Sequence, residues 1–155
     1  MLQRPIRTLI ENRRGLAAPP QTTVFHATRM MKELGEGAVM VVDAGRLAGI
    51  FTERDVLYRV VAEGRDPKIT LLSQVMSTDP QTIHPDNPIG EALRMMLKGG
   101  YRNVPVVEND EPIGIVSIRD ALSDEFCDFA SERAGFPIST ELFGLNGFRT
   151  TTSGH

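Results

Sequence analysis

The chain has 155 residues with a formal net charge of −3, and 41% of its residues are hydrophobic and 24% charged. This composition excludes the hydrophobicity-poor, highly charged chains that stay disordered. The slightly acidic balance argues against nucleic-acid binding, because proteins of that class carry a basic face. No apolar run approaches the roughly 18 residues of a membrane helix, so we expect no membrane insertion and a cytoplasmic location.

The first half of the chain predicts a strand, a helix, a hairpin and a second helix, in that order. The short apolar piece 22–25 predicts the strand, and apolar residues at positions i, i+3, i+4 and i+7 within 27–34 predict an amphipathic helix. Two apolar runs, 38–42 and 47–51, flank a polar loop and predict a β-hairpin. The second helix is expected to bury four side chains: Val56, Leu57, Val60 and Val61.

The second half predicts the same elements in the same order. A short strand is expected at 81–83, and the helix after it is expected to be capped by Asp86 or Asn87, with Pro88 near its first turn. The remaining elements are a hairpin from the runs 104–107 and 113–116, and a closing helix that buries Ala121, Leu122, Phe126 and Phe129.

The two halves are copies of one unit. Residues 24–57 match residues 89–122 without gaps, at a displacement of 65 residues. A unit of about 60 residues buries little surface alone, so we expect the copies to pack together as a pseudo-twofold pair. A linker with Gly, Asp and Pro lies at 63–68. The expected domains are a first repeat at 5–66, a second repeat at 67–130 and a C-terminal tail at 131–155.

One short motif follows the hairpin in both copies. Residues 49–55 (GIFTERD) and 114–120 (GIVSIRD) share the pattern G-h-x-[ST]-x-R-D, where h is apolar. One interpretation is a capping box, in which the hydroxyl and the carboxylate satisfy free backbone donors at a helix start. The other is a ligand site, in which the hydroxyl, the helix start and the arginine bind phosphate and the carboxylate accepts both hydroxyls of a ribose. The sequence leaves both interpretations open.

Together these features resemble CBS domains, named after cystathionine-β-synthase, and in particular the tandem pair known as a Bateman module. The resemblance rests on the motif, on the V-P-V-V strand at 104–107 and on the lead-in at 73–76, which residues 7–10 repeat. It covers residues 5–130 and is similar to the small stand-alone bacterial type. The resemblance implies an α/β (α+β) fold of two tandem β-α-β-β-α repeats.

The resemblance also implies a regulatory protein and not an enzyme. Modules of this kind bind an adenosine ligand in the cleft between their repeats, so the implied ligand is an adenine nucleotide such as AMP, ADP, ATP or NAD. A homodimer through exposed helix faces and a separate enzyme or transporter regulated in trans are implied as well. Two alternatives stay open: a ligand-free structural or dimerisation module, whose motifs only cap helices, and a regulatory subunit that acts in trans on an enzyme or transporter.

The resemblance implies that equivalent residues of the two copies contact the ligand. The resemblance implies that a hydroxyl approaches the phosphate and an aspartate holds the ribose diol, here Thr52 with Asp55 and Ser117 with Asp120. It implies a base between 22–24 and 37–39 in the first copy, and between 82–83 and 101–105 in the second. The residues assigned to nucleotide binding are Thr22, Val24, Gly37, Ala38, Val39, Gly49, Thr52, Arg54, Asp55, Thr82, Ile83, Tyr101, Arg102, Asn103, Val104, Pro105, Gly114, Ser117, Arg119 and Asp120.

Residues for catalysis or metal binding are not expected. The three histidines, His26, His84 and His155, are scattered along the chain and are predicted to lie at the surface. The single cysteine, Cys127, has no disulfide or zinc partner and is predicted to lie on an apolar helix face. A phosphate-binding loop of the G-x-x-x-x-G-K-[ST] type does not occur in the sequence. The sequence therefore predicts neither a catalytic centre nor a bound metal.

Overall fold

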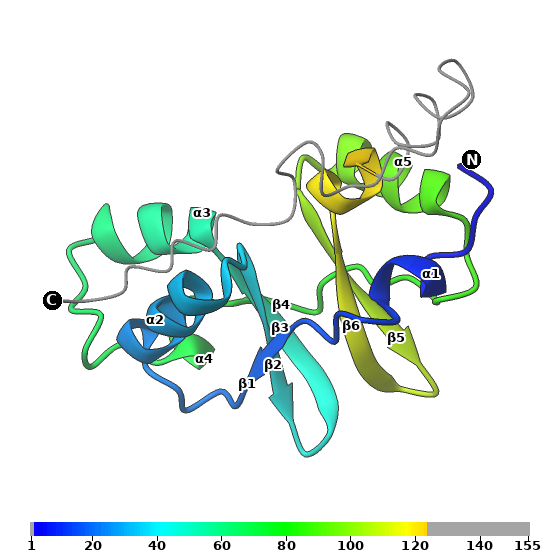
Figure 1. Cartoon of the computed structure of the whole chain (residues 1–155). Coiled ribbons are helices and arrows are strands. Elements are labelled where there is room, and N and C mark those ends of the chain that lie inside the picture. The colour runs from blue at the N-terminus through cyan, green and yellow to red at the C-terminus, as the bar shows by residue number, and fades with distance from the viewer. Residues whose placement is uncertain (1, 124–155) are drawn as a thin grey trace, which may run out of the picture.

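The computed structural model describes residues 2–123, which form two similar lobes side by side (Figure 1). Within this part of the chain, one lobe contains a four-stranded sheet in the order β1-β2-β3-β4, and the other contains the hairpin β5-β6. The expected mixed α/β architecture is confirmed. The elements are α1 (Arg7–Ile10), β1 (Leu16–Ala18), α2 (Val24–Leu34), β2 (Ala38–Asp43), β3 (Arg46–Thr52), α3 (Glu53–Asp55), the π-helix η1 (Val56–Val61), α4 (Leu72–Val75), β4 (Ser77–Thr78), α5 (Ile89–Gly99), β5 (Asn103–Glu108) and β6 (Glu111–Ser117).

The amphipathic helices and the hairpins lie where the sequence predicts them. Helices α2 and α5 both end at a glycine in the left-handed conformation, Gly35 and Gly100, which terminates the helix at no steric cost. The hairpins β2-β3 and β5-β6 have the same register, with a β-bulge at the same place in each. The apolar face of each helix lies in a core. Its buried residues include Ala27 and Met31 in α2, and Ala92 and Met96 in α5.

The strand predicted at 22–25 is wrong. The Thr23 hydroxyl accepts a hydrogen bond from the backbone N–H of His26, so Thr23 caps α2 and the helix begins at Val24. The side-chain cap overrides the short apolar run, and the strand beside β2 is instead β1. In the second lobe, the expected strand at 81–83 is reduced to a single parallel bridge between Ile83 and Val106. Helix α5 receives no side-chain cap from Asp86 or Asn87, because its N-cap position is Pro88 itself.

The prediction for the second helix of the first lobe is half correct. Val60 is fully buried and Val56 is partly buried, but the side chains of Leu57 and Val61 are 54% and 65% exposed. Residues 56–61 form a π-helix, in which hydrogen bonds span five residues and the turn is wider than in an α-helix. Only one narrow stripe of this helix therefore faces the core, and its other apolar side chains face solvent.

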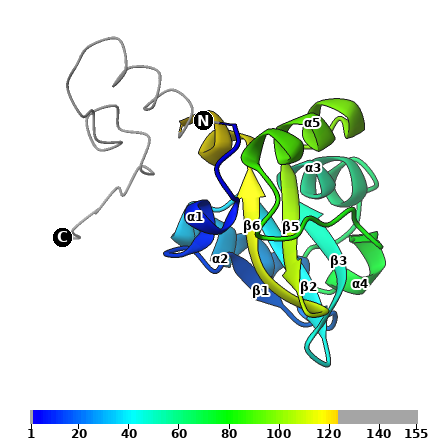
Figure 2. The ribbon, with the colours of Figure 1, turned by 90° about the vertical axis from the view of Figure 1, so that its right-hand side faces the viewer.

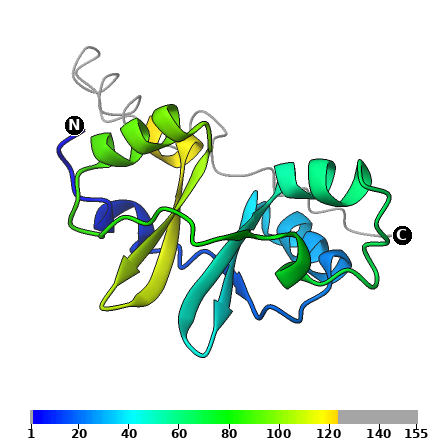
Figure 3. The ribbon, with the colours of Figure 1, turned by 180° about the vertical axis from the view of Figure 1, so that it is seen from behind.

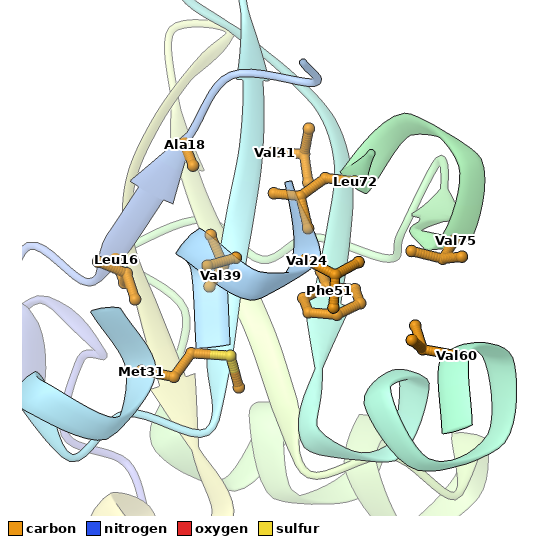
Figure 4. Close-up of a cluster of buried hydrophobic side chains, with 11 residues drawn as sticks. Leu16, Ala18, Val24, Met31, Val39, Val41, Phe51, Val60, Leu72 and Val75 are labelled. Carbon is orange, nitrogen blue, oxygen red and sulfur yellow. The ribbon is translucent and has the colours of Figure 1, made fainter. Parts of the chain in front are cut away.

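The lead-in helices cross between the lobes. Helix α4 packs into the core of the first lobe through Leu72 and Val75, which lie close to Phe51 and Val60 (Figure 4). Helix α1, which precedes the first lobe in sequence, lies beside β6 in the second lobe (Figure 2). Seen from behind, the segment that carries α4 runs back across β3 (Figure 3). The core of each lobe is therefore completed by the lead-in segment of the other repeat.

The crossing follows the pseudo-twofold relation. Pro5 forms an antiparallel bridge with Pro88, and Leu71 forms the equivalent bridge with Thr23. Each bridge joins a lead-in segment to the start of an amphipathic helix in the other repeat.

An ion-pair cluster fixes the N-terminal arm, residues 2–14, to the second lobe. The Arg7 guanidinium lies 2.9 Å from the Asp86 carboxylate and 2.6 Å from the Glu108 carboxylate. The hydrogen bond from Arg7 holds the pKa of Glu108 below its ordinary value of 4.5. A depressed folded-state pKa gives stability that is present above the unfolded-state pKa and is lost as pH falls through the folded-state pKa.

We therefore expect Glu108→Gln to lower the melting temperature at neutral pH, by an amount that shrinks as the pH falls below 4.5. Thermal unfolding of both proteins across an acid-to-neutral pH series measures this difference. Glu111→Gln, an exposed glutamate at the start of β6, is the control and leaves the melting temperature unchanged. A deficit of the same size at every pH would contradict a role for the Glu108 charge.

Several predicted residues lie outside the described part of the chain. Phe126, Phe129 and Cys127 are among them, as is the tail 131–155.

Within residues 2–123, none of the helices combines the length and the hydropathy needed to cross a bilayer.

Candidate functional site

The first copy of the motif forms a hydrogen-bonded cap at the junction of β3 and α3. One carboxylate oxygen of Asp55, Oδ2, accepts hydrogen bonds from the Thr52 backbone N–H at 2.8 Å and from its hydroxyl at 3.2 Å. The other oxygen, Oδ1, lies 3.4 Å from the Arg59 guanidinium. Arg59 also donates to the backbone carbonyls of Val75 and Met76. Asp55 is 8% exposed, so these groups hold a buried charge in place.

The hydroxyl–carboxylate hydrogen bond recurs in the second copy, where the backbone hydrogen bond and the arginine are different. The Ser117 hydroxyl donates to Oδ2 of Asp120 at 2.7 Å and accepts from the Asp120 backbone N–H at 3.1 Å. Oδ1 of Asp120 pairs with Arg13 at 2.7 Å, and Arg13 comes from the N-terminal arm. The capping interpretation is thus confirmed in both copies. In each copy the motif hydroxyl contacts Oδ2 and an arginine contacts Oδ1.

Each motif opens onto a cavity lined by both repeats. Cavity I has a volume of about 980 Å³ and cavity II of about 600 Å³. Thr52 and Asp55 face the second repeat across cavity I, while Ser117 and Asp120 face the first repeat across cavity II. Cavity I is lined by Gly37, Ile50, Thr52, Glu53, Arg54, Asp55, Leu57, Tyr58, Arg59, Ser77, Pro80, Gln81, Gly100, Tyr101, Arg102 and Asn103. Cavity II is lined by Arg13, Thr28, Met31, Lys32, Leu34, Gly35, Glu36, Gly37, Glu53, Val56, Arg102, Asn103, Ser117, Ile118, Arg119 and Asp120.

The two cavities share a wall of four residues: Gly37, Glu53, Arg102 and Asn103. Gly37 and Arg102 are equivalent positions of the repeat, 65 residues apart. Their backbones play the same part, since the Gly37 carbonyl accepts from the Glu53 N–H and the Arg102 carbonyl accepts from the Ile118 N–H. Gly37 has no side chain, whereas Arg102 carries a guanidinium. Of this equivalent pair, only Arg102 brings a cation to the shared wall.

The structure brings ten of the twenty predicted binding residues to the cavities. Those ten are Gly37, Thr52, Arg54, Asp55, Tyr101, Arg102, Asn103, Ser117, Arg119 and Asp120. Among the residues described, the other ten line neither cavity: Thr22, Val24, Ala38, Val39, Gly49, Thr82, Ile83, Val104, Pro105 and Gly114. Four of these, Val24, Val39, Ile83 and Val104, are buried in the two hydrophobic cores.

The motif glycines serve the crossing of the chain and not the cavities. A Cβ on Gly49 would lie 2.6 Å from the Ser77 carbonyl oxygen, so no other residue fits against β4 there. A Cβ on Gly114 would lie 3.2 Å from the Ile10 side chain and 3.4 Å from the Arg13 carbonyl oxygen. Both glycines let a lead-in segment lie directly against a hairpin strand. Gly114 thereby fixes the backbone of Arg13 near Asp120.

The cavities combine residues that the sequence analysis assigned to separate sites. Thr52 and Asp55 share cavity I with 100–103 of the second repeat, whereas the sequence analysis paired them with 22–24 and 37–39 of their own repeat. Arg13, Arg59 and Glu36 were missed as lining residues. Arg13 carried no signal, because only the crossing of the arm brings it to Asp120. Arg59 carried a weak one, since it lies one helical turn after Asp55.

Burial and charge give the cavities different walls. In cavity II, burial raises the pKa of Glu36, and the charge of Asp120 raises it further while Arg13 and Arg119 lower it. In cavity I, burial raises the pKa of Tyr101, whose hydroxyl donates to Gln81. The Arg54 guanidinium lies 5.3 Å from the centre of the Tyr58 ring. Cavity I therefore presents aromatic and cationic groups together, and cavity II presents charged groups of both signs beside apolar side chains.

A possible cation site lies away from the cavities. His84, Asp86 and Glu108 bring one ligand atom each to within 4.8 Å of one another. Arg7 is hydrogen-bonded to both carboxylates and already compensates their charge. A metal ion there would have to displace Arg7, so the residues fit an ion-pair cluster better than a metal site.

Comparison with known proteins decides the family. The model of the CBS domain matches the chain twice, over residues 10–62 and 72–124. The chain belongs to the CBS-domain family. Each matched CBS domain contains one copy of the hydroxyl–carboxylate motif. The resemblance drawn from the repeat and its motifs is confirmed.

Relatives and solved structures extend the match to the pair of CBS domains. The CBS domain-containing protein YhcV of Bacillus subtilis is 34% identical over 120 residues, which are 77% of this chain and 83% of YhcV. CBSCBSPB3 of Arabidopsis thaliana is 41% identical over 112 residues, 72% of this chain. This chain spans about a fifth of the length of that relative. A CBS domain protein of Pyrobaculum aerophilum complexed with AMP matches with a TM-score of 0.69 at 25% identity, covering 75% of this chain and 88% of that one.

Proposed function

We propose that this tandem CBS module is a regulatory protein that binds an adenine nucleotide in cavity I and cavity II. The observation that carries the proposal is the position of the two aspartates. Each accepts a hydrogen bond from the motif hydroxyl on Oδ2 and turns Oδ1 toward an arginine that lines a cavity between the repeats. A carboxylate in that position accepts both hydroxyls of a ribose. The binding of AMP by a similar protein supports the choice of ligand.

The size and lining of the cavities suit a nucleotide. Small-molecule sites have volumes of about 300–1,000 Å³, and both cavities fall in this range. Arg54, Arg119 and the shared Arg102 supply cations for a phosphate. In cavity I, the rings of Tyr58 and Tyr101 supply faces for an adenine base. AMP, ADP, ATP and NAD share these groups and are the candidate ligands.

Nucleotide binding would be reported by a change in how the lobes are arranged. Both cavities lie between the repeats, so a ligand stabilises the arrangement that it binds better. The exposed apolar side chains of Leu57 and Val61 in η1, a helix at the edge of cavity I, form the surface we propose for a homodimer. The protein regulated in trans would be an enzyme or a transporter that senses this change.

Calorimetric titration of nucleotide-free protein with AMP, ADP, ATP and NAD tests the proposal. We expect saturable binding of at least one ligand, and Asp55→Asn and Asp120→Asn to weaken one site each by about tenfold or more, which is about 1.4 kcal/mol. Asparagine retains an oxygen for each cap, so these variants stay folded. The double variant loses binding at both sites.

Asp110→Asn is the matched control. Asp110 lies at the exposed tip of the β5-β6 hairpin, at a positive φ that asparagine tolerates, and lines neither cavity. It leaves binding unchanged. If folded wild-type protein binds none of the four nucleotides, the motifs are helix caps only and the module is structural.

A further inference from the structure

The N-terminal arm brings Arg13 to the carboxylate at the edge of cavity II. Arg13 Nη1 lies 2.7 Å from Asp120 Oδ1, and both side chains are partly exposed. The arm is held in place on both sides of Arg13. Ile6 and Ile10 are buried in the core of the second lobe, and Gly15 lies against Ile115. The position of Arg13 is therefore fixed by the fold, and its side chain reaches Asp120 from a defined direction.

Among residues 2–123, no arginine of a lead-in segment pairs with the aspartate of cavity I. The lead-in of the second repeat places Thr78 and Asp79 after α4, where the first lead-in places Arg13 after α1. Asp55 pairs instead with Arg59 of its own helix, at 3.4 Å. The two aspartates are equivalent in the repeat, but their cations come from unrelated parts of the chain. Arg13 thus distinguishes cavity II from cavity I.

A ribose diol that binds Asp120 approaches the oxygen that Arg13 now contacts and competes with the guanidinium for it. The guanidinium then loses its partner, and the nearest other carboxylates on the cavity wall are Glu36 and Glu53. Arg13 makes no ion pair with either of them in the part of the chain that the structure describes. A ligand phosphate replaces the lost carboxylate, because a guanidinium forms charge-assisted hydrogen bonds with both groups. A nucleoside without phosphate offers no such replacement.

We propose that Arg13 is the residue that makes cavity II selective for a phosphorylated ligand over the corresponding nucleoside. The proposal rests on the proposed nucleotide binding. Arg13 opposes the binding of adenosine by competing for Asp120, and it favours the binding of AMP by pairing with the phosphate. Lys32, Arg102 and Arg119 also line the cavity and contribute to phosphate affinity, but none of them is paired with Asp120. Arg13 alone among these four is expected to act on the two ligands in opposite directions.

The test compares AMP with adenosine in a protein that carries Asp55→Asn, so that cavity II dominates the signal. We expect Arg13→Gln to weaken AMP binding and to leave adenosine binding equal or tighter. The ratio of the two affinities then falls by about tenfold or more, equivalent to about 1.4 kcal/mol. The control is Arg14→Gln, which removes the neighbouring exposed arginine that lines neither cavity. It leaves the ratio unchanged.

The outcomes separate this inference from the proposed function. An unchanged ratio in Arg13→Gln, or an equal loss for both ligands in a variant with unaltered thermal unfolding, overturns the role of Arg13 and leaves nucleotide binding intact. If the Asp55→Asn protein binds no AMP, cavity II is not a nucleotide site and both proposals fail for it.

Discussion

Ile6→Ala is expected to lower the free energy of unfolding by about 2–5 kcal/mol. Ile6 belongs to the N-terminal arm, yet its side chain is fully buried in the core of the second lobe. Removing most of that side chain leaves a cavity among Ile89, Val104 and other residues that are distant in sequence. Chemical denaturation followed by circular dichroism measures the loss.

Ile69→Ala is the matched control for this prediction. The same atoms are removed, but Ile69 is 75% exposed, so the free energy of unfolding changes little. If both variants cost the same small amount, the arm does not complete the second core, and the crossing of the lead-in segments would be contradicted.

The parts of the fold that the sequence predicts are those encoded over short distances. Helices α2 and α5 follow from a spacing of three and four residues, and the hairpins follow from apolar runs around polar turns. Thr23 shows where such reasoning fails, because one side-chain cap turns an apolar run into a helix start. Leu57 and Val61 show another failure, because a π-helix does not follow the period assumed for burial.

The candidate site is predicted only in part because it is built by tertiary contacts. The motif identifies Asp55 and Asp120, since these residues recur at the same place in each repeat. It does not identify what lies opposite. The apolar spacing of the lead-in segments is the same whether they pack on their own repeat or on the other, so the crossing cannot be read from it. Arg13 reaches Asp120 through that crossing, and the shared wall forms where the two repeats meet.

The structure confirms the cap in both repeats, and the ligand site is a proposal that the cap does not contradict. The sequence presents these as rival interpretations of one motif. In both repeats Oδ2 of the aspartate accepts a hydrogen bond from the motif hydroxyl, and Oδ1 lies against an arginine that lines the cavity. A confirmed cap therefore does not argue against a ligand, because the cap orients the carboxylate that a ligand would use.

Arg102→Gln is expected to weaken nucleotide binding in both cavities, by about 10- to 100-fold at each. The physical reason is its position in the shared wall, opposite Thr52 with Asp55 on one side and Ser117 with Asp120 on the other. A hydrogen bond to a charged group contributes about 1.5–3 kcal/mol, which corresponds to this range of affinity. The equivalent position in the first repeat is Gly37, which has no side chain to compensate the loss.

Two neighbouring arginines provide matched controls for the Arg102 prediction. Arg54 lines only cavity I and Arg119 lines only cavity II, so Arg54→Gln and Arg119→Gln each affect one site. Titrations in the Asp55→Asn and Asp120→Asn proteins assign each effect to a cavity. If Arg102→Gln weakens nucleotide binding in one cavity only, Arg102 does not contact the ligands of both cavities. A loss in both cavities would mean that Arg102 contributes to both sites. Two bound phosphates then compete for one guanidinium, so occupancy of one cavity lowers the nucleotide affinity of the other.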